Sequence, residues 1–404
     1  MPFGLPSVPS FHHAVQTISL RTRNLATISL ANFTAPSVQT FYANPLLWNG
    51  HLQTCYTSLN PADPYDVYYA RKHLINPNDG GHFALDFVVD KFNEPASEDL
   101  PVRTKHMTAV EASGLGSDDT KPMLVALHGL SGGSHEIYLR AVLAPLITKE
   151  SGFAGCVVNA RGCAMSKITT QQLFNARFTE DIREATKYLK KIYPNRPLYV
   201  VGFSLGANIL TNYLAEEGES CVYKAAVVCS NPWNLEICCK ALHRTFMGRM
   251  YSKVMGGSLR ALFEQHVEEL RSDTRIDVEA VRSGVFMDDF DRDLTSKVFD
   301  YPTVGAYYRD ASSVDNVLKV RVPTFILHAR DDPIAVDEAA PYYEVKVNPY
   351  CFMATTGIGG HLSWFEGGGG RWFARTIVTF FQNFQNEVLE VLPVKPEQGQ
   401  HSGI

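Results

Sequence analysis

The sequence has no apolar run long enough to cross a membrane and no excess of basic residues. Hydrophobic residues make up 45% of the chain, but no segment approaches the ~18 consecutive apolar residues that a spanning helix requires. Lys and Arg number 37 against 42 Asp and Glu, a formal net charge of −5. Binding to a nucleic-acid backbone needs a basic excess. The composition therefore argues against an integral membrane protein and against a nucleic-acid partner.

Cysteine is scarce, with eight scattered residues and neither a CxxC pair nor a Cys/His cluster spaced like a zinc site. Cys156, Cys229 and Cys351 lie inside apolar runs typical of buried strands, where cysteine acts as a small hydrophobe. Adjacent Cys238 and Cys239 are poorly placed to bridge each other. The glycine-rich stretches GLGSDD and GGGG lack the strand-to-helix setting of a dinucleotide site. We therefore expect no cofactor, no metal and a reducing, intracellular compartment.

Both ends of the chain differ from its centre. Before Asp63 there is no acidic residue, whereas Arg21, Arg23 and many Ser and Thr occur, a bias shared by organelle-targeting peptides. The stretch lacks a strong amphipathic repeat, so residues 1–43 are predicted to form a variable, partly ordered arm. We expect a cytoplasmic location, with lipid-droplet or mitochondrial association as alternatives. The tail 394–404, with Pro, Gln, Gly and Ser, is predicted to be disordered.

From residue 123 onward, short apolar runs alternate with helical patterns. Each run is almost continuously apolar, as expected for a strand that is buried on both faces. The alternation predicts the α/β class, with a mostly parallel sheet flanked by helices in one domain over 44–393. Upstream, residues 80–90 alternate like an antiparallel strand that extends the sheet at its first edge. The predicted strands cover 123–129, 155–162, 197–204, 225–232, 324–332 and 351–357, and the predicted helices 136–150, 179–193, 207–218 and 372–392.

Residues 233–322 break this rhythm. The stretch is helical and charged, and it separates two consecutive predicted strands by far more than a usual connection. It is therefore predicted to be a helical lid insertion. Its large apolar side chains either receive an acyl chain or pack the lid against the body, and both interpretations stay open: Phe246, Met250, Tyr251, Phe263 and Phe286.

Residues 202–206, Gly-Phe-Ser-Leu-Gly, fit G-x-S-x-G, in which a strand ends in a sharp turn and a helix begins at once. Glycine is expected on both sides of Ser204 because a Cβ there would collide with the neighbouring helix or strand. The turn would then expose the hydroxyl of Ser204 as a nucleophile. Residues 129–133 also match, but Ser131 lies in a glycine-rich loop and is predicted to make only local hydrogen bonds.

A serine hydroxyl is a weak nucleophile until a base takes its proton and an acid fixes the tautomer of that base. On this fold the expected chain order is Ser, then Asp or Glu, then His. Of the thirteen histidines, His361 alone lies between the last predicted strand and the last predicted helix, and it is the predicted base. Asp331 and Asp332 compete for the acid role. Asp332, directly before a proline, is favoured, and the other carboxylate is expected to cap the turn or bind backbone N–H groups.

Backbone groups are predicted to stabilise the reaction's negative charge. The N–H of Leu205 follows the nucleophile, and the N–H of Leu130 lies in the loop after an early strand, so the two should converge as an oxyanion hole. His128 and His328 lie inside strand patterns and are interpreted as buried, hydrogen-bonded histidines.

Seven segments together resemble one branch of the α/β-hydrolase superfamily: NPLLWNGHLQT at 44–54, LHGLSGGSHEIYLR, NARGCAMSKITT, FTEDIREATKYL, GFSLGANILTNYL, ARDDPI and GGHLSWFEG. The branch includes yeast medium-chain fatty-acid ethyl ester synthases/esterases, bacterial hydrolases and animal lipases. The resemblance extends roughly over 44–384. It implies the α/β-hydrolase fold and a serine acyl-enzyme that forms or hydrolyses fatty acyl esters, with Ser204, Asp332 and His361 as its catalytic triad.

One motif, W-x-x-G-H-x-Q-T near the N-terminus, is specific to this branch. The matching residues are interpreted as structural, packing the arm beside the site: Trp48, Gly50, His51, Gln53 and Thr54. The chain departs from the yeast enzymes in its short N-terminal arm, and from many hydrolases in GCAMSK, where they carry a second glycine. Both departures leave the substrate preference open.

Three functions follow as hypotheses. The first is a serine esterase and acyltransferase that passes the acyl group of an ester or acyl-CoA to water or to an alcohol such as ethanol. The second uses the same machinery on monoacylglycerol, a phospholipid or an ester in secondary-metabolite biosynthesis. The third, a binding protein on a hydrolase scaffold, would predict damage to the nucleophile, acid or base, and all three are intact. Contact with a membrane or lipid droplet through the arm or lid, and the oligomeric state, stay open.

Overall fold

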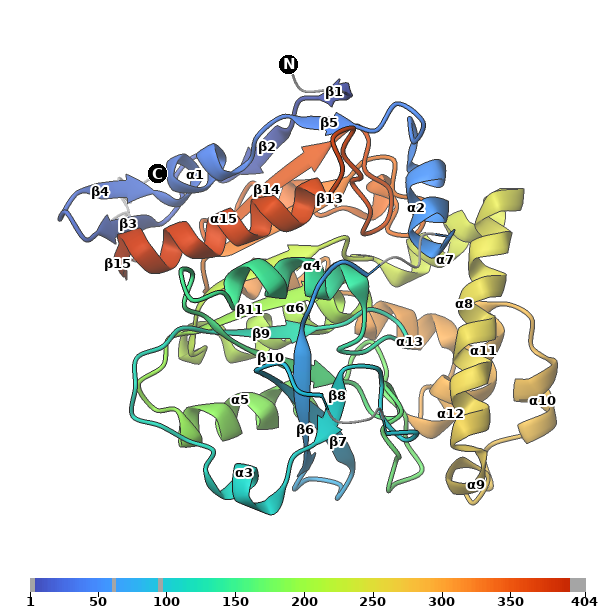
Figure 1. Ribbon diagram of the computed structural model, residues 1–404. Coiled ribbons are helices and arrows are strands. Elements are labelled where there is room, and N and C mark those ends of the chain that lie inside the picture. The colour runs from blue at the N-terminus through green and yellow to red at the C-terminus, as the bar shows by residue number, and fades with distance from the viewer. Residues whose placement is uncertain (1–3, 60–62, 94–96, 393–404) are drawn as a thin grey trace, which may run out of the picture.

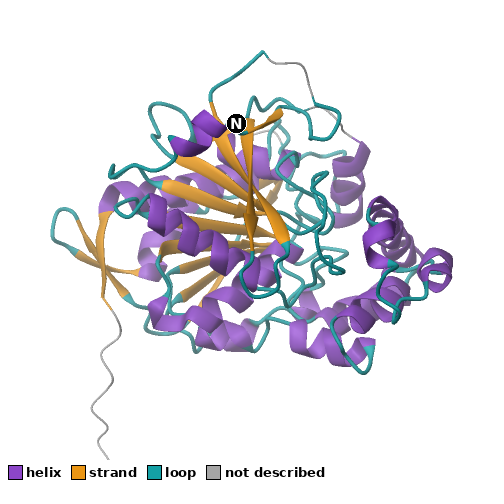
Figure 2. Ribbon diagram, turned by 90° about the horizontal axis from the view of Figure 1, so that it is seen from below, coloured by secondary structure: helices purple, strands orange, loops and turns teal. Residues whose placement is uncertain are grey.

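The computed structural model describes residues 4–59, 63–93 and 97–392 (Figure 1). The predicted disordered tail 394–404 lies outside the described residues. The centre of the molecule is a ten-stranded sheet in the order β2-β14-β13-β12-β11-β9-β10-β7-β6-β8. Helices cover both of its faces (Figure 2). Among the described residues, no helix combines the length and apolar character needed to cross a membrane.

The strands predicted from residue 123 onward are confirmed, and they run parallel to one another at the centre of the sheet. Because helices lie on both faces, each strand is buried on both sides, which explains its continuous apolar sequence. These strands are β9 (Met123–Leu127), β10 (Ala154–Asn159), β11 (Leu198–Phe203), β12 (Tyr223–Cys229), β13 (Thr324–Ala329) and β14 (Cys351–Thr356).

Three more strands, of which β7 and β6 pair antiparallel and β8 pairs parallel with β6, extend the sheet beyond β10. The predicted strand at 80–90 is β7 (His82–Val89), which pairs antiparallel with β10, but it is not the edge. β6 (Tyr68–Ile75) and β8 (Thr104–His106) lie outside it. The sequence did not predict β6, because the charged residue Arg71 interrupts its apolar pattern. That arginine is buried through an ion pair with Asp86 of β7, with 2.7 Å between Nε and Oδ1.

The helices follow the predicted positions, with one correction at the C-terminal end. The sequence predicts a helix over 372–392, but α15 ends at residue 387 and the chain continues as β15 (Val388–Leu392). β15 pairs with β3, and β-branched Val388 and Val391 favour a strand once a partner is present. The body helices are α3 (Ala109–Ser113), α4 (Ile137–Leu146), α5 (Glu180–Ile192), α6 (Leu205–Glu217), η2 (Gly218–Ser220), η5 (Asp337–Ala339), α14 (Tyr342–Val345) and α15 (Trp372–Glu387).

The N-terminal region is tied into the fold by short strands that the sequence did not reveal. One of them joins β14 antiparallel as an edge of the main sheet, and others pair with β5 and β15. Strands of three or four residues are too short to show a periodic pattern. Whether such a segment forms a strand depends on its pairing partner, which for β2 and β3 lies far along the chain. The elements are β1 (Leu5–Ser7), β2 (Ser10–His13), β3 (Ser19–Thr22), β4 (Thr27–Ser29), α1 (Leu30–Thr34), η1 (Ala35–Ser37), β5 (Phe41–Ala43) and α2 (Gly50–Leu59).

The segment between β12 and β13 is helical, and its helices gather on one side of the molecule (Figure 1). One of them, η3, is a π-helix. The segment contains α7 (Leu235–Arg244), α8 (Phe246–Gln265), α9 (Val267–Leu270), α10 (Val278–Ser283), α11 (Met287–Phe290), η3 (Asp291–Thr295), α12 (Ser296–Val298), α13 (Val304–Ala311) and η4 (Asn316–Lys319).

Candidate active site

Ser204 occupies a sharp turn between β11 and α6. Its φ is +52°, in the left-handed region that non-glycine residues rarely adopt. A Cβ on Gly202 would lie 2.6 Å from the carbonyl oxygen of Gly206, and a Cβ on Gly206 would lie 2.4 Å from that of His128. Both positions therefore require glycine, for the steric reason inferred from the sequence. The turn presents the serine hydroxyl at the carboxyl end of the sheet.

The structure brings Ser204, His361 and Asp332 together in one hydrogen-bonded chain. Nε2 of His361 lies 2.8 Å from Oγ of Ser204, and Nδ1 lies 2.8 Å from Oδ2 of Asp332. The other carboxylate oxygen of Asp332 accepts the backbone N–H groups of Ile334 at 2.8 Å and Ala335 at 2.9 Å. Asp332 is buried, so these contacts fix its orientation. In this arrangement the imidazole is placed to take the serine proton while the carboxylate holds its tautomer.

Asp331 lies beside this chain but supports the backbone of the histidine loop. Its Oδ1 accepts the N–H of Gly360 at 3.0 Å, a bond of the kind expected for the competing carboxylate. Among the described residues, Asp331 makes no hydrogen bond with the His361 ring. Burial raises the pKa of the Asp331 carboxyl, and the neighbouring Asp332 raises it further.

The N–H groups of Leu130 and Leu205 are both available beside the nucleophile. Leu130, Ser204 and Leu205 line the same cavity, and no acceptor among the described residues pairs with either N–H. Leu205 is the first residue of α6, where helix N–H groups have no partner within the helix. The N–H of Gly129 donates to the hydroxyl of Tyr138 at 2.8 Å, which holds the other loop in place. The oxyanion role of the two leucine N–H groups stays a prediction.

The remaining residues of the two predicted loops have local roles. Oγ of Ser131 donates to the carbonyl oxygen of Leu130 at 2.9 Å, as expected for a loop serine. His128 is buried, donates from Nδ1 to the carbonyl of Gly129 at 2.6 Å and accepts the N–H of Ala160 at Nε2. Burial lowers the pKa of His128 to about 4, so the ring is neutral at pH 7. His328 is buried as predicted, and its Nε2 lies 3.3 Å from Oδ1 of Asp337, which gives the ring a polar partner.

Helix α2 carries three motif residues that support the site, in agreement with the structural role inferred for them from the sequence, although their individual contacts could not be inferred. Oγ1 of Thr54 accepts the N–H of His361 at 2.9 Å and donates to the carbonyl of Gly50 at 2.7 Å. Oε1 of Gln53 accepts the N–H of Phe365 at 2.8 Å. A Cβ on Gly50 would lie 1.9 Å from the carbonyl oxygen of Asp331. These contacts brace the histidine loop against α2, which gives most of the branch-specific motif a structural reason.

Two residues of the same motif do not pack beside the site. Trp48 is 60% exposed, which contradicts the interpretation of this residue as packing. His51 is exposed as well, and its Nδ1 lies 3.0 Å from the hydroxyl of Tyr251 on α8. The two rings are stacked with 5.7 Å between centroids, so α2 and α8 touch here.

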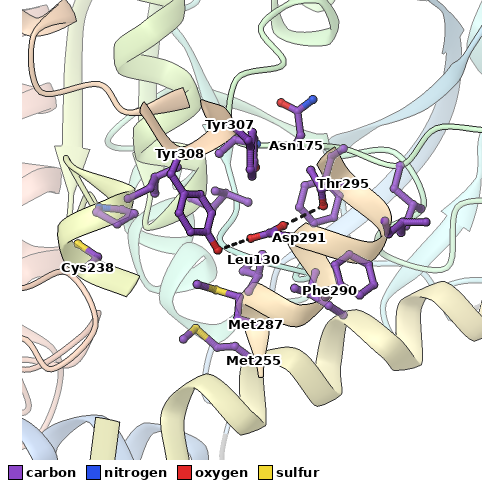
Figure 3. A pocket seen from close by; sticks show the side chains of 18 of the residues that line it. Leu130, Asn175, Cys238, Met255, Met287, Phe290, Asp291, Thr295, Tyr307 and Tyr308 are labelled. Carbon is purple, nitrogen blue, oxygen red and sulfur yellow. Dashed lines mark hydrogen bonds between the residues drawn. The ribbon is translucent and has the colours of Figure 1, made fainter. Parts of the chain in front are cut away.

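A cavity opens at Ser204 between the body and the insertion (Figure 3). Its walls are mostly apolar. The insertion supplies the side opposite the serine, including Leu242, Met255, Leu259, Leu270, Met287, Phe290, Leu294, Val298 and Phe299.

The five insertion residues that the sequence offered for an acyl chain do not line this cavity. Phe246 and Met250 point to solvent, and Phe263 is buried elsewhere in the insertion. Tyr251 stacks on the body, and Phe286 packs edge-on against His243. The phase of α8 explains the difference, because Met255 and Leu259 lie on the face that lines the cavity, whereas Phe246 and Met250 lie on roughly the opposite face of the helix.

One cluster in the insertion has metal-ligand chemistry. Ligand atoms of Cys239, His243 and Asp288 lie within 4.8 Å of one another. Nε2 of His243 already pairs with Oδ1 of Asp288 at 2.7 Å, and burial raises the pKa of the Cys239 thiol to about 12. The arrangement is therefore explained by a hydrogen bond between His243 and Asp288 beside the neutral thiol of Cys239, without a metal ion.

Comparison with known proteins gives matches that cover most of the chain. A family model described as the alpha/beta hydrolase fold matches residues 122–367. Monoacylglycerol lipase of Saccharomyces cerevisiae is 38% identical over 372 residues, covering 87% of this chain and 82% of that protein. Medium-chain fatty acid ethyl ester synthase/esterase 2 of the same yeast is 32% identical over 397 residues, covering 86% and 87%. Human phospholipase ABHD3 is 28% identical over 329 residues, covering 81% and 74%.

Proposed function

Because this chain belongs to the α/β-hydrolase family, we propose that it is a serine esterase that hydrolyses lipid esters through an acyl-enzyme on Ser204. The observation that carries the proposal is the hydrogen-bonded chain from Ser204 through His361 to Asp332. The substrate class is supported by the names of the relatives, which describe a monoacylglycerol lipase, an ethyl ester synthase/esterase and a phospholipase. The apolar cavity beside the serine suits a fatty acyl chain.

In the proposed reaction, Nε2 of His361 takes the proton of Ser204 while Oγ attacks the ester carbonyl carbon. The negative charge on the carbonyl oxygen is held by the N–H groups of Leu130 and Leu205, each worth about 3 kcal/mol. The intermediate collapses, the carbon–oxygen bond to the alcohol breaks, and the imidazolium returns its proton to the leaving alcohol. Asp332 stabilises the imidazolium throughout. A water molecule, deprotonated by the same histidine, then releases the acid.

Transfer of the acyl group to ethanol is the second candidate activity. Hydrolysis and transfer share every step except the final acceptor, so the same residues serve both. The ethyl ester synthase/esterase relative favours this candidate. To separate the two, purified protein is offered p-nitrophenyl esters and acyl-CoAs of rising chain length, with and without ethanol. Activity that peaks at medium chains together with ethyl ester formation supports transfer, whereas acid as the sole product restricts the protein to hydrolysis.

A fluorophosphonate probe tests the nucleophile itself. We expect labelling of the unmodified protein and none of Ser204→Ala. The matched control is Ser131→Ala, because residues 129–133 fit the same G-x-S-x-G pattern and Oγ of Ser131 makes only a local hydrogen bond. This control should be labelled like the unmodified protein. Labelling that survives in Ser204→Ala, or an unmodified protein that is never labelled, would refute the proposed function.

We also propose that the esterase meets its substrate at an anionic membrane or lipid-droplet surface. Exposed apolar side chains flank the contact between α2 and α8, next to the histidine loop: Leu46, Trp48, Leu52, Phe246, Met250 and Val254. Arg249 and Lys253 lie among them, and neither α2 nor the first three turns of α8 contain an acidic residue. This combination suits an anionic lipid interface.

Vesicles with and without anionic lipid test the surface. Phe246→Ser and Trp48→Ser should weaken binding to anionic vesicles, whereas Val110→Ser, an equally exposed apolar residue on α3, should not. If all three variants bind anionic vesicles equally well, the proposal that this surface binds lipid is contradicted. The eight cysteines, all described and all unpaired, further support the reducing, intracellular location that we propose.

A further inference from the structure

Among the described residues that line the apolar cavity, Asp291 alone carries a carboxyl group (Figure 3). It is 9% exposed and lies at the first position of the π-helix η3. Its Oδ2 accepts the hydroxyl of Tyr308 at 2.8 Å, and its Oδ1 accepts the hydroxyl of Thr295 at 2.8 Å. Both partners also line the cavity. The three side chains form a polar cluster, which we call the Asp291 cluster, in an otherwise mostly apolar wall.

A carboxyl group is costly at this position. Burial raises its pKa to about 6, and no Lys or Arg among the described residues forms an ion pair with it. A cavity that received only hydrocarbon would gain nothing from a carboxyl group here, because burying that group costs free energy that only its two hydroxyl partners offset. π-Helical turns occur frequently at functional sites. The residue and its backbone conformation both point to a role in binding.

The Asp291 cluster has unused capacity to accept hydrogen bonds. A carboxylate oxygen has two acceptor positions, and each oxygen of Asp291 uses one for a hydroxyl of the protein. The hydroxyls of Tyr308 and Thr295 both donate their hydrogen bonds to Asp291, so toward the cavity they too can only accept. A ligand that complements the cluster must therefore donate a hydrogen bond while the rest of it is apolar. A neutral hydroxyl group on a fatty ester meets both conditions.

We propose that the Asp291 cluster is a hydroxyl-binding subsite that makes the protein selective for esters with a free hydroxyl group. The proposal rests on the proposed function for the reaction at Ser204. The hydroxyl has two sources with the same chemistry: the alcohol part of the ester, as in monoacylglycerol, or the acyl chain, as in a hydroxy fatty acid. Either one places a hydroxyl group in the cavity that Ser204 and Asp291 share.

A structural role is the alternative, since Tyr308 belongs to α13 and Asp291 to η3, so that their hydrogen bond connects two parts of the insertion. A purely structural contact would change stability and lower activity on all esters alike. A binding subsite would change the ratio between hydroxylated and plain esters. The ratio therefore separates the two roles.

The test compares kcat/KM in two arms with acyl chains of equal length. One arm uses 1-decanoylglycerol against methyl decanoate, and the other uses the p-nitrophenyl esters of 10-hydroxydecanoate and decanoate. We expect the unmodified protein to favour the hydroxylated ester in one arm by about 10- to 100-fold, as for a hydrogen bond to a charged group. In Asp291→Leu this preference should disappear while activity on the plain ester persists. The arm that shows the preference identifies the source of the hydroxyl.

Asp293→Asn is the matched control, because it lies in the same π-helix, pairs with Arg292 and does not line the cavity. It should keep the preference. If Asp291→Leu does not fold, Tyr308→Phe and Thr295→Val remove the partner hydroxyls one at a time and should each weaken the preference.

Equal activity on both esters of each arm, or a preference unchanged in Asp291→Leu, would overturn the subsite while leaving the esterase intact. If no ester is cleaved at all, the proposed function fails separately. The subsite is then judged by whether the hydroxylated ester raises the melting temperature of Ser204→Ala more than the plain ester does.

Discussion

Replacing Asp332 with Asn tests which carboxylate fixes the histidine. In the native site, Oδ1 of Asp332 accepts two backbone N–H groups, and Oδ2 accepts Nδ1–H of His361. An asparagine keeps its carbonyl oxygen on the two backbone donors, so its NH₂ group faces Nδ1. The ring must then carry its proton on Nε2, pointing at Ser204. A protonated Nε2 is unable to take the serine proton.

The expected loss of kcat is about 10⁴-fold, the size found when a triad aspartate becomes asparagine with the geometry intact. At about 1.4 kcal/mol per tenfold, this corresponds to roughly 5.5 kcal/mol of transition-state stabilisation. The folded structure should change little, because the side chain keeps its shape and both backbone hydrogen bonds. The measurement is kcat on a p-nitrophenyl ester at pH 8, accompanied by a thermal melt.

Asp331→Asn is the control for this change. Its amide oxygen still accepts the N–H of Gly360, and the native side chain makes no hydrogen bond with the His361 ring. We expect kcat within about threefold of the unmodified protein, since a surviving hydrogen bond leaves the loop in place. The reasoning is refuted if Asp332→Asn keeps more than a tenth of the activity, or if Asp331→Asn loses as much as Asp332→Asn does.

Three further outcomes follow from the structure. Gly206→Ala should lower the free energy of unfolding in a denaturant titration by at least about 2 kcal/mol, because its Cβ would lie 2.4 Å from a backbone carbonyl oxygen, whereas Gly368→Ala, with nothing within 4 Å, should be neutral. Thr54→Val should lower kcat/KM about tenfold by leaving the N–H of His361 without its acceptor, and Thr54→Ser should restore it. The pKa of Asp291 in the folded protein, about 6, is above its unfolded value, so ionisation of this carboxyl disfavours folding and the free energy of unfolding falls as pH rises from about 4 to 6. In denaturant titrations across this window, the free energy of unfolding of the unmodified protein should fall by on the order of 2–3 kcal/mol relative to that of Asp291→Asn. A difference between the two proteins that does not change with pH would contradict the raised pKa.

The parts of the fold that the sequence predicts are those in which local pattern and tertiary environment agree. The central strands are apolar on both faces because helices cover both faces of the sheet. Strands such as Met123–Leu127 and Cys351–Thr356 can therefore be predicted from their own residues alone. The turn at Ser204 can be predicted for a similar reason. Gly202 and Gly206 are required by close contacts with residues a few positions away or with the end of the adjacent strand.

The unpredicted parts depend on partners that are distant in sequence. β6 contains Arg71, and its burial becomes favourable only through Asp86 on another strand. Thr54 belongs to the motif that was interpreted as structural, but its partner was not predicted, because the N–H of His361 lies 307 positions away in the sequence. Asp291 looks like one more acid in a charged segment, because nothing in its neighbours shows that Tyr308 and an apolar cavity enclose it.

The pairing of β3 with β15 joins the two ends of the described chain and has a consequence for synthesis on the ribosome. Arg23 donates to the carbonyl oxygen of Gln385, 362 positions later. At about 5–20 residues per second, roughly 20 to 70 s separate the emergence of one from that of the other. During this time β3 has β4 on one side and an open edge on the other, the kind of edge that invites pairing with other chains. β3 therefore waits for nearly the whole described chain to be made, and until then the newly made chain exposes to aggregation an edge that β15 covers in the folded molecule.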